Sequence, residues 1–422
     1  MRISRFLKPK VCWSESPLRA LSSWILILYI AVQPFHQLIA PYFRYSYLYL
    51  SLIALIFGFF ILLLRIRCGK PLDLLSDFFR APWYCDARRE KNRKWQAPIN
   101  FLIVSVVLFV IVLIKFNEHI GYSKILGAMV VPFFIGLLLS TGNRLERFGQ
   151  LLFYYLIVKL IILLAFYDLY FLQTPRRPVI EGIALYLWLG LGMDFFVVLL
   201  GLYINHSKSK IFQCSCMGAA IALAFVLVGI NSRSILYISV MASISGMIIL
   251  KSKESSVLLL TFIAALLIFM LYIPGRAEHF TNMLASLSSL IQLDGIVPDK
   301  STELRINGLV FYFSADPSFF GVDRDFVYHH HFLPGAIYYN LGLLGLFIYM
   351  VFCIYYIHAG LLLFSRGFSD KAIALFAASI FMSTLYTGNL FNSVYLFLFA
   401  GLMIGLLSGG ERSKKLGNHL LL

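Results

Sequence analysis

Long apolar runs fill most of this chain and constrain its fold more than any other feature of the sequence. A helix that crosses a bilayer needs roughly 20 mostly apolar residues. About twelve runs approach or exceed this length, so the sequence predicts an all-α, polytopic integral membrane protein with about twelve transmembrane helices. The expected spans are 21–40, 46–64, 97–114, 125–141, 149–173, 182–204, 213–229, 234–250, 257–273, 336–357, 372–388 and 390–408.

Composition agrees with this prediction and excludes two other classes of protein. Hydrophobic residues make up 60% of the chain and charged residues only 13%, whereas about 25% of a soluble domain is charged. This excludes an ordinary soluble enzyme, and the high hydrophobicity excludes a disordered chain. The formal net charge of +16 fits either a membrane protein or a nucleic-acid-binding protein. The position of the charges decides between these two classes.

The basic residues gather in alternate connections between the apolar runs. With the N-terminus in the cytoplasm, 25 of the 36 Lys and Arg residues fall on the cytoplasmic side. This bias follows the positive-inside rule and predicts that both termini are cytoplasmic. It also makes nucleic acid an unexpected partner. The densest basic run, 88–94, is then a topological signal, with contact to anionic lipid headgroups as the alternative.

Two connections are too long to be simple turns, and they divide the chain. Residues 1–273 hold the first nine expected helices, with a basic cytoplasmic loop at 65–96. Residues 274–335 form a large loop on the outer face, and 336–422 hold the last three helices and a cytoplasmic tail. Function concentrates in loops that a rigid scaffold positions, so the outer loop is the expected location of the site.

Two arginines stand out because they break the inward charge bias. Arg233 lies at the outer junction of two expected helices, and Arg305 lies in the outer loop. A guanidinium group presents a planar fork of donors that matches phosphate oxygens, so the pair is a candidate pyrophosphate clamp. The alternative is that each arginine extends to the headgroup level for structural reasons alone. Arg276 and Arg324 are weaker candidates of the same kind.

Three consecutive histidines, His329, His330 and His331, lie near the end of the outer loop. Histidine titrates near neutral pH, which suits general acid–base catalysis. A polar cluster at the membrane interface is one alternative. A zinc site is another, because His329 and His331 could supply two ligands, but the outer loop has no cysteine and its acids are not at a tight metal-motif spacing. No metal and no cofactor are therefore expected.

Two ionisable residues fall inside expected spans, where charges are costly and rare. Lys159 lies near the middle of span 149–173, and Asp194 lies near the middle of span 182–204. The two residues fall at similar depth, so we expect a structural ion pair between neighbouring helices. A proton relay of the kind found in transporters is the functional alternative.

The order of these elements resembles the O-antigen polymerases and O-antigen ligases, which are bacterial inner-membrane glycosyltransferases of the GT-C type. Ser-Arg-Ser at 232–234 resembles the Ser/Thr-Arg element of these families. Arg305 followed by Asp-Pro-Ser-Phe-Phe-Gly at 316–321 resembles their Arg and Pro-x-x-x-Gly segment. His331 and Gly-Leu-Leu-Gly-Leu at 342–346 resemble their His-Asn and Gly-x-x-Gly-Leu ending. Phe332 stands where the family has Asn, so His329 or His330 could take the role of His331.

The resemblance implies a function and a set of partners. The donor would be a glycan on undecaprenyl pyrophosphate in the outer leaflet, held by Arg233 and Arg305, with His331 acting on the acceptor hydroxyl. A polymerase would use a second lipid-linked repeat unit as acceptor, and a ligase would use lipid A–core. The resemblance also implies membrane lipid, a chain-length regulator and a flippase as partners. We expect a metal-independent polymerase, with a ligase as the alternative and a polysaccharide transporter or flippase as the more distant one.

Overall fold

The computed structural model describes slightly less than half of the chain. The described residues are 21, 24–26, 28–29, 46–67, 89–120, 125–140, 148–165, 179–180, 183–184, 210–230, 253–273, 281, 307, 310–312, 314, 319–322, 333–365, 370, 373–375, 377–378, 380–381, 384 and 394–409. Helices dominate these residues, as the sequence predicts. The helices are α3 (Ser46–Arg67), α5 (Arg89–Ile120), the π-helical turn η2 (Leu126–Val130), α7 (Val131–Ser140), α8 (Phe148–Ala165), α10 (Lys210–Ile230), α12 (Lys253–Tyr272), α15 (Leu333–Phe364) and α17 (Val394–Gly409).

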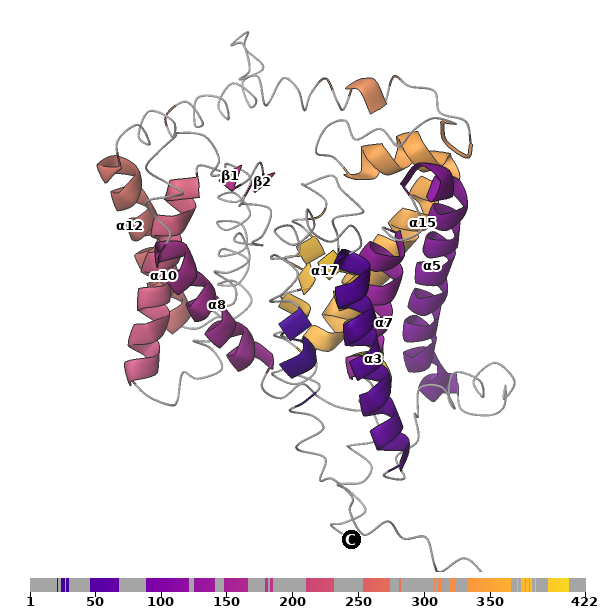
Figure 1. The fold of residues 1–422 in the computed structure, drawn as a ribbon, viewed down its shortest axis with the longest axis horizontal. Helices are drawn as coiled ribbons and strands as arrows, with labels where there is room; N and C mark the ends of the chain where they lie inside the picture. The colour runs from indigo at the N-terminus through magenta and orange to yellow at the C-terminus, as the bar shows by residue number, and fades with distance from the viewer. Residues whose placement is uncertain are drawn as a thin grey trace, which may run out of the picture.

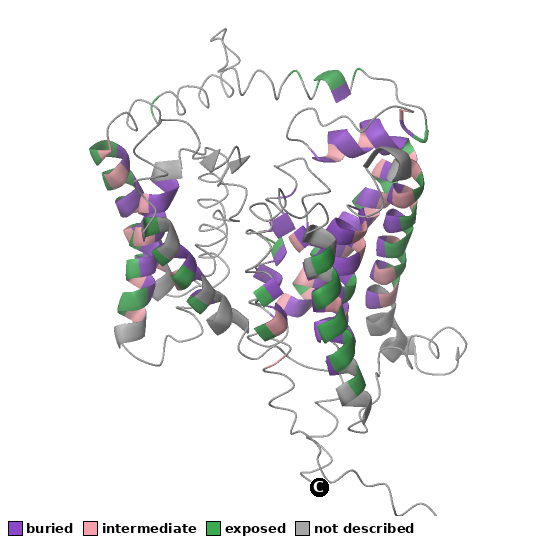
Figure 2. Ribbon diagram, viewed as in Figure 1, coloured by how far each residue is buried: buried purple, intermediate pink, exposed green. Residues whose placement is uncertain are grey.

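Two stretches of helix are long and apolar enough to cross a membrane. They are Pro98–Lys115 within α5 and the whole of α15, and shorter apolar helices accompany them in the described part of the chain. Many large hydrophobic residues of these helices are exposed, and Figure 2 shows exposed residues recurring along α3 and α5. Soluble proteins rarely expose contiguous apolar surface on this scale, so the described surface favours a membrane protein.

The described helices pack in two groups (Figure 1). In one group α10 contacts both α8 and α12, and in the other α17 contacts α7, α5 and α15. The second group holds most of the interior aromatic side chains. Phe109, Phe133 and Phe397 meet there in edge-on pairs with ring centroids 5.3 and 5.5 Å apart. Edge-to-face contact of this kind is the favourable geometry for aromatic rings in a packed core.

Small residues let α7 and α17 approach each other closely. Gly401 and Gly405 are four residues apart in α17 and lie against Phe133 and Ser140 of α7, while Gly136 of α7 lies against the backbone of Leu398. A Cβ atom added at any of these glycines would collide with the facing helix. Helices in membranes commonly associate through such small-residue pairs, because close backbone contact replaces the hydrophobic driving force.

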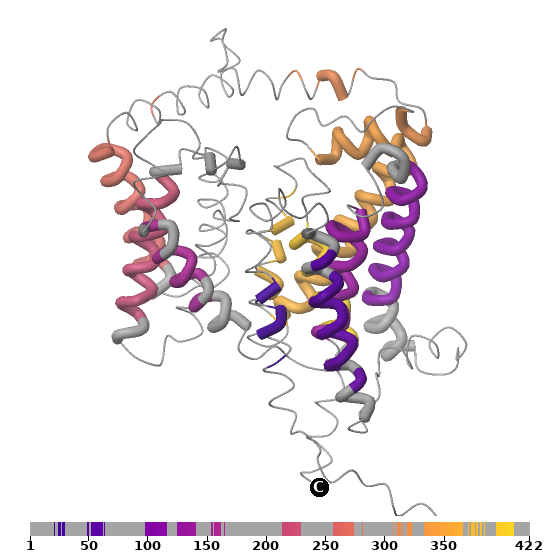
Figure 3. The backbone as a smooth tube through the Cα atoms, viewed as in Figure 1, coloured from indigo at the N-terminus to yellow at the C-terminus, as the bar shows by residue number. Residues whose placement is uncertain are grey.

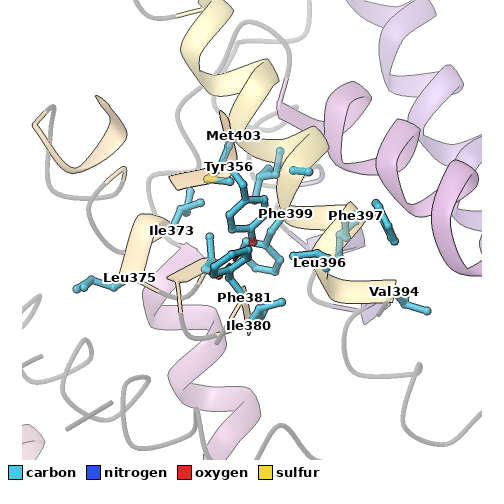
Figure 4. Close-up of a cluster of buried hydrophobic side chains, with 14 of the residues drawn as sticks. Tyr356, Ile373, Leu375, Ile380, Phe381, Val394, Leu396, Phe397, Phe399 and Met403 are labelled. Carbon is cyan, nitrogen blue, oxygen red and sulfur yellow. Dashed lines mark hydrogen bonds between the residues drawn. The ribbon is translucent and has the colours of Figure 1, made fainter. Parts of the chain in front are cut away.

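The same core continues to the described residues at 373–381, which lie among side chains of α15 and α17 (Figure 4). Tyr356 of α15 stacks on Phe381 with ring centroids 5.3 Å apart. Its hydroxyl group donates a hydrogen bond of 3.1 Å to the carbonyl oxygen of Ala377. The expected span 372–388 therefore packs against α15 through its described residues. The hydroxyl group of the buried Tyr356 is hydrogen-bonded, as buried polar groups usually are.

Two boundaries differ from the sequence prediction. Helix α5 begins at Arg89, so part of the basic run assigned to the loop 65–96 is helical. A short antiparallel pair consists of β1 (Val179–Ile180) and β2 (Ile183–Ala184), and β2 occupies residues at the approximate start of the span expected at 182–204. Ile183 and Ala184 are therefore in a strand and not in a helix. The apolar character of Ile183 and Ala184 extends the run in the sequence, but it does not distinguish a strand from a helix.

Candidate functional site

The five residues proposed to carry the chemistry, Arg233, Arg305 and the histidines His329–His331, lie outside the described residues. The same holds for Arg276, Arg324 and Asp194. The structure instead describes residues that flank Arg305 and the histidine run in the sequence, and we call these residues the frame. This frame consists of three pieces: residues 310–312 with 314, the turn 319–322 and the first part of α15.

Helix α15 is broken at Gly342. This residue has φ 69° and ψ −166° in the middle of an otherwise helical segment of 32 residues. That conformation is essentially restricted to glycine, because a side chain would clash with the backbone. Before the break α15 lies across the end of the helix group, and after it α15 descends beside α5 (Figures 1 and 3). The expected span 336–357 thus contains a break that the sequence analysis did not predict.

Two backbone hydrogen bonds between the turn 319–322 and α15 replace helical bonds that are lost at the break. The Leu344 amide donates to the Phe319 carbonyl oxygen at 3.3 Å, and the Val322 amide donates to the Tyr339 carbonyl oxygen at 3.1 Å. Both α15 groups flank the non-helical residue, where the regular pattern of helical bonds fails. Pairing of such groups is essential at membrane depth, since no water is present to satisfy them.

Gly321 and Gly342 make this docking possible. Gly321 has φ 87°, and a Cβ atom on it would collide with the backbone of Asn340. A Cβ atom on Gly342 would collide with the backbone of Phe319 and Gly321. The turn and the broken helix therefore touch backbone to backbone. Both glycines belong to the quoted Pro-x-x-x-Gly and Gly-x-x-Gly segments, which gives those positions a physical reason to be glycine.

A small aromatic cluster joins the third piece of the frame to α15. We call Tyr312, Ala336, Tyr339 and Val322 the tyrosine cluster, because these residues form a buried core separate from the main one. The rings of Tyr312 and Tyr339 have centroids 6.0 Å apart, and Phe311 approaches Tyr339 at 5.0 Å. Asn340 is also buried, and its side-chain amide donates to the Ala336 carbonyl oxygen at 2.7 Å.

The tyrosine cluster brings together the chain on both sides of the candidate residues. Tyr312 follows Arg305 by seven residues, and Tyr339 follows His331 by eight. The stretch 323–332, which holds the three histidines, starts at Val322 and ends where α15 begins at Leu333. Both of its ends are therefore held by the first part of α15. The sequence alone did not predict this cluster, because Tyr312 and Tyr339 both lie among apolar residues and nothing in the sequence pairs them.

Within the described part of the chain, no group of three His, Cys, Asp or Glu residues could hold a metal ion. The histidine run, on which the zinc alternative depends, lies outside that part. Lys159 in α8 is buried, with 7% of its surface exposed, which agrees with an inward-facing charge in an apolar helix. Cys216 is buried and Cys214 exposed near the start of α10, and both are free thiols.

Comparison with known proteins gives no family: no protein-family model and no curated protein matches this chain. The resemblance to the O-antigen enzymes thus depends on the motifs quoted above.

Proposed function

We propose that this protein is a multi-pass glycosyltransferase of the bacterial inner membrane that polymerises undecaprenyl-pyrophosphate-linked repeat units on the periplasmic face. The observation that carries the proposal is the tyrosine cluster. Tyr312 and Tyr339 hold together the two chain segments next to Arg305 and the histidine run. The proposed site needs the arginine that binds the leaving group to lie close to the histidine that acts on the acceptor. Because the tyrosine cluster holds the segments next to both, it limits the distance between them.

The proposed reaction is a substitution at the anomeric carbon of the donor sugar. The acceptor hydroxyl oxygen forms a bond to that carbon while the bond to the pyrophosphate oxygen breaks. Arg233 and Arg305 bind the pyrophosphate and stabilise the charge that develops on it as it leaves. His331, or a neighbour in the run, takes the proton from the acceptor hydroxyl and later releases it to water. Undecaprenyl pyrophosphate is the second product.

A transporter is the second candidate function, and one observation favours it. Helix α15 is discontinuous at Gly342, and discontinuous helices are typical of transporters. In transporters, however, the break lies near the bilayer midplane and exposes backbone groups to a substrate. In α15 the break follows the helix start by nine residues, and the turn 319–322 covers the groups that it exposes. The covered break therefore favours a structural role in an enzyme.

A deletion strain separates the candidate functions by its products. Loss of a polymerase leaves lipopolysaccharide cores that carry one repeat unit. Loss of a ligase leaves bare cores and full-length polymer on the lipid carrier, whereas loss of a flippase leaves bare cores and single repeat units on the carrier. Electrophoresis of lipopolysaccharide, together with extraction of carrier-linked glycan, distinguishes the three results. A normal ladder in the deletion strain would contradict all of them.

Complementation of that strain tests the site. We expect Arg305→Ala and His331→Ala to abolish the ladder while immunoblots show normal amounts of protein in the membrane. Arg305→Lys retains the charge but loses the donor fork, so it should restore only part of the ladder. Lys300→Ala changes another cation of the same loop and serves as the matched control, with full activity expected. Full activity in Arg305→Ala would remove that residue from the mechanism.

A further inference from the structure

The turn that docks on α15 carries two exposed aromatic side chains. Phe319 and Phe320 have 55% and 63% of their surface exposed, although they lie in a turn held by backbone hydrogen bonds. Their rings meet edge to face with centroids 5.1 Å apart. Neither ring belongs to the tyrosine cluster or to the main core. Two adjacent exposed phenylalanines are costly in water, which suggests that an apolar partner covers them.

Below the break, α15 presents one continuous apolar face. Six exposed apolar residues recur there every three or four positions, which places them along one side of the helix: Leu343, Phe347, Met350, Ile354, Ile357 and Leu361. The opposite side holds the buried residues Tyr349, Phe352 and Tyr356. Because α15 is long and apolar enough to cross a membrane, the exposed side is the one that would face lipid acyl chains. We call it the lipid-facing stripe.

The hydrogen bond between the Leu344 amide and the Phe319 carbonyl oxygen holds the turn at the N-terminal end of this stripe, next to the break. Leu343, the first residue of the stripe, precedes that amide directly. The two phenylalanines thus continue the apolar surface of α15 beyond the point where the helix changes direction. With the stripe in lipid, this adjoining apolar surface would lie at the edge of the bilayer, where lipid can cover it.

We infer that the Phe319–Phe320 turn is a membrane-contact surface, with both rings inserted among the lipids at the bilayer edge where α15 breaks. The inference rests on the membrane placement of α15 in the proposed function, but not on the glycosyl-transfer chemistry. The turn would hold the tyrosine cluster at the height of the lipid headgroups, through the bond between Val322 and Tyr339. A site at that height suits a substrate whose pyrophosphate is attached to a membrane-embedded lipid.

Photo-crosslinking of the full-length protein tests this contact directly. Benzoylphenylalanine is introduced by amber suppression at the position of Phe320, Phe347 or Phe352, one at a time. The proteins are reconstituted in vesicles of phosphatidylethanolamine and phosphatidylglycerol and are irradiated. We expect a mass increase of one phospholipid at the Phe320 and Phe347 positions. The Phe352 position is buried in the core and serves as the control without a lipid adduct.

The three positions separate failure of the inference from failure of the membrane placement. A lipid adduct at the Phe347 position but not at the Phe320 position would overturn the inference alone. Absence of an adduct at both positions would overturn the membrane placement of α15 as well. A crosslinked product with the mass of two chains at the Phe320 position would assign the surface to a second copy of the protein. If the bulky probe prevents folding, a Phe320→Trp variant is used in a chain whose five native tryptophans are replaced by Phe. Quenching of its fluorescence by brominated lipid would support lipid contact at this position, and absence of quenching would contradict it.

Discussion

Gly321 and Gly342 lie backbone to backbone, twenty-one residues apart in the sequence, and both have positive φ angles. One belongs to the turn at the end of the outer loop and the other to the break in α15. Their contact lets the turn supply hydrogen bonds to both sides of the break. The loop and the helix are therefore one structural unit at this point, and a change at either glycine should affect both.

Substitution of this glycine pair should destabilise the protein. Gly342→Ala forces a side chain into a conformation that costs about 1–3 kcal/mol, and the new Cβ atom would also collide with the turn. We expect a lower midpoint of thermal unfolding in detergent and weaker complementation of the deletion strain. Gly360→Ala lies in the same helix with open space around it, so it is the matched control and should be neutral or slightly stabilising. Equal midpoints for the two variants would contradict the proposed role of Gly342.

Close packing of α7 on α17 should tolerate no side chain at Gly401. Its Cβ atom would meet the backbone of Phe133, so Gly401→Ala must push the two helices apart. Overpacking of this kind costs about 1–3 kcal/mol. We expect less folded protein after size-exclusion chromatography in detergent. The same change at Gly218 in α10, where a Cβ atom meets no neighbour, should leave the elution profile unchanged.

Because Lys159 is buried, loss of a partner carboxylate would leave its charge unpaired in the interior, so the proposed ion pair with Asp194 can be tested through stability. If the pair exists, Lys159→Met alone leaves a carboxylate without its partner, and Asp194→Leu alone leaves an ammonium group without its partner. Removal of one member of a buried pair typically costs about 3–5 kcal/mol. The charge-swapped chain, Lys159→Asp with Asp194→Lys, should recover part of the stability that each single variant loses. Failure to recover any stability, measured as the thermal midpoint in detergent, would count against the pair.

Cysteine labelling checks both packing and orientation. In chains that retain a single cysteine, Cys214 should react readily with a maleimide in detergent, and Cys216 and Cys353 should react slowly. Among the three cysteines that the structure describes, Cys214 is exposed and the other two are buried. The predicted topology places Cys214 near the cytoplasmic end of its span. In spheroplasts, a membrane-impermeant maleimide should thus label Cys214 only after the membrane is permeabilised. Labelling of intact spheroplasts would reverse the predicted orientation.

Local patterns in the sequence determined the helical class of the described chain. Apolar runs predicted helices at α3, α10 and α12 with ends close to those observed, because helix length and burial in lipid depend on the apolarity of a single segment. The resemblance to the O-antigen enzymes, and not the apolar pattern, drew attention to the glycines at 321 and 342 as parts of two motifs. Neither the pattern nor the resemblance could show that the two motifs touch.

Tertiary structure decided which of these local elements act together. The break in α15 is compatible with its sequence only because the turn 319–322 satisfies the backbone groups that the break exposes. Likewise, Tyr312 and Tyr339 are unremarkable residues until packing brings their rings together beside Val322. Contacts between residues that are far apart in the chain depend on the whole packed arrangement. They leave no periodic signal in the sequence, and only the folded chain reveals them.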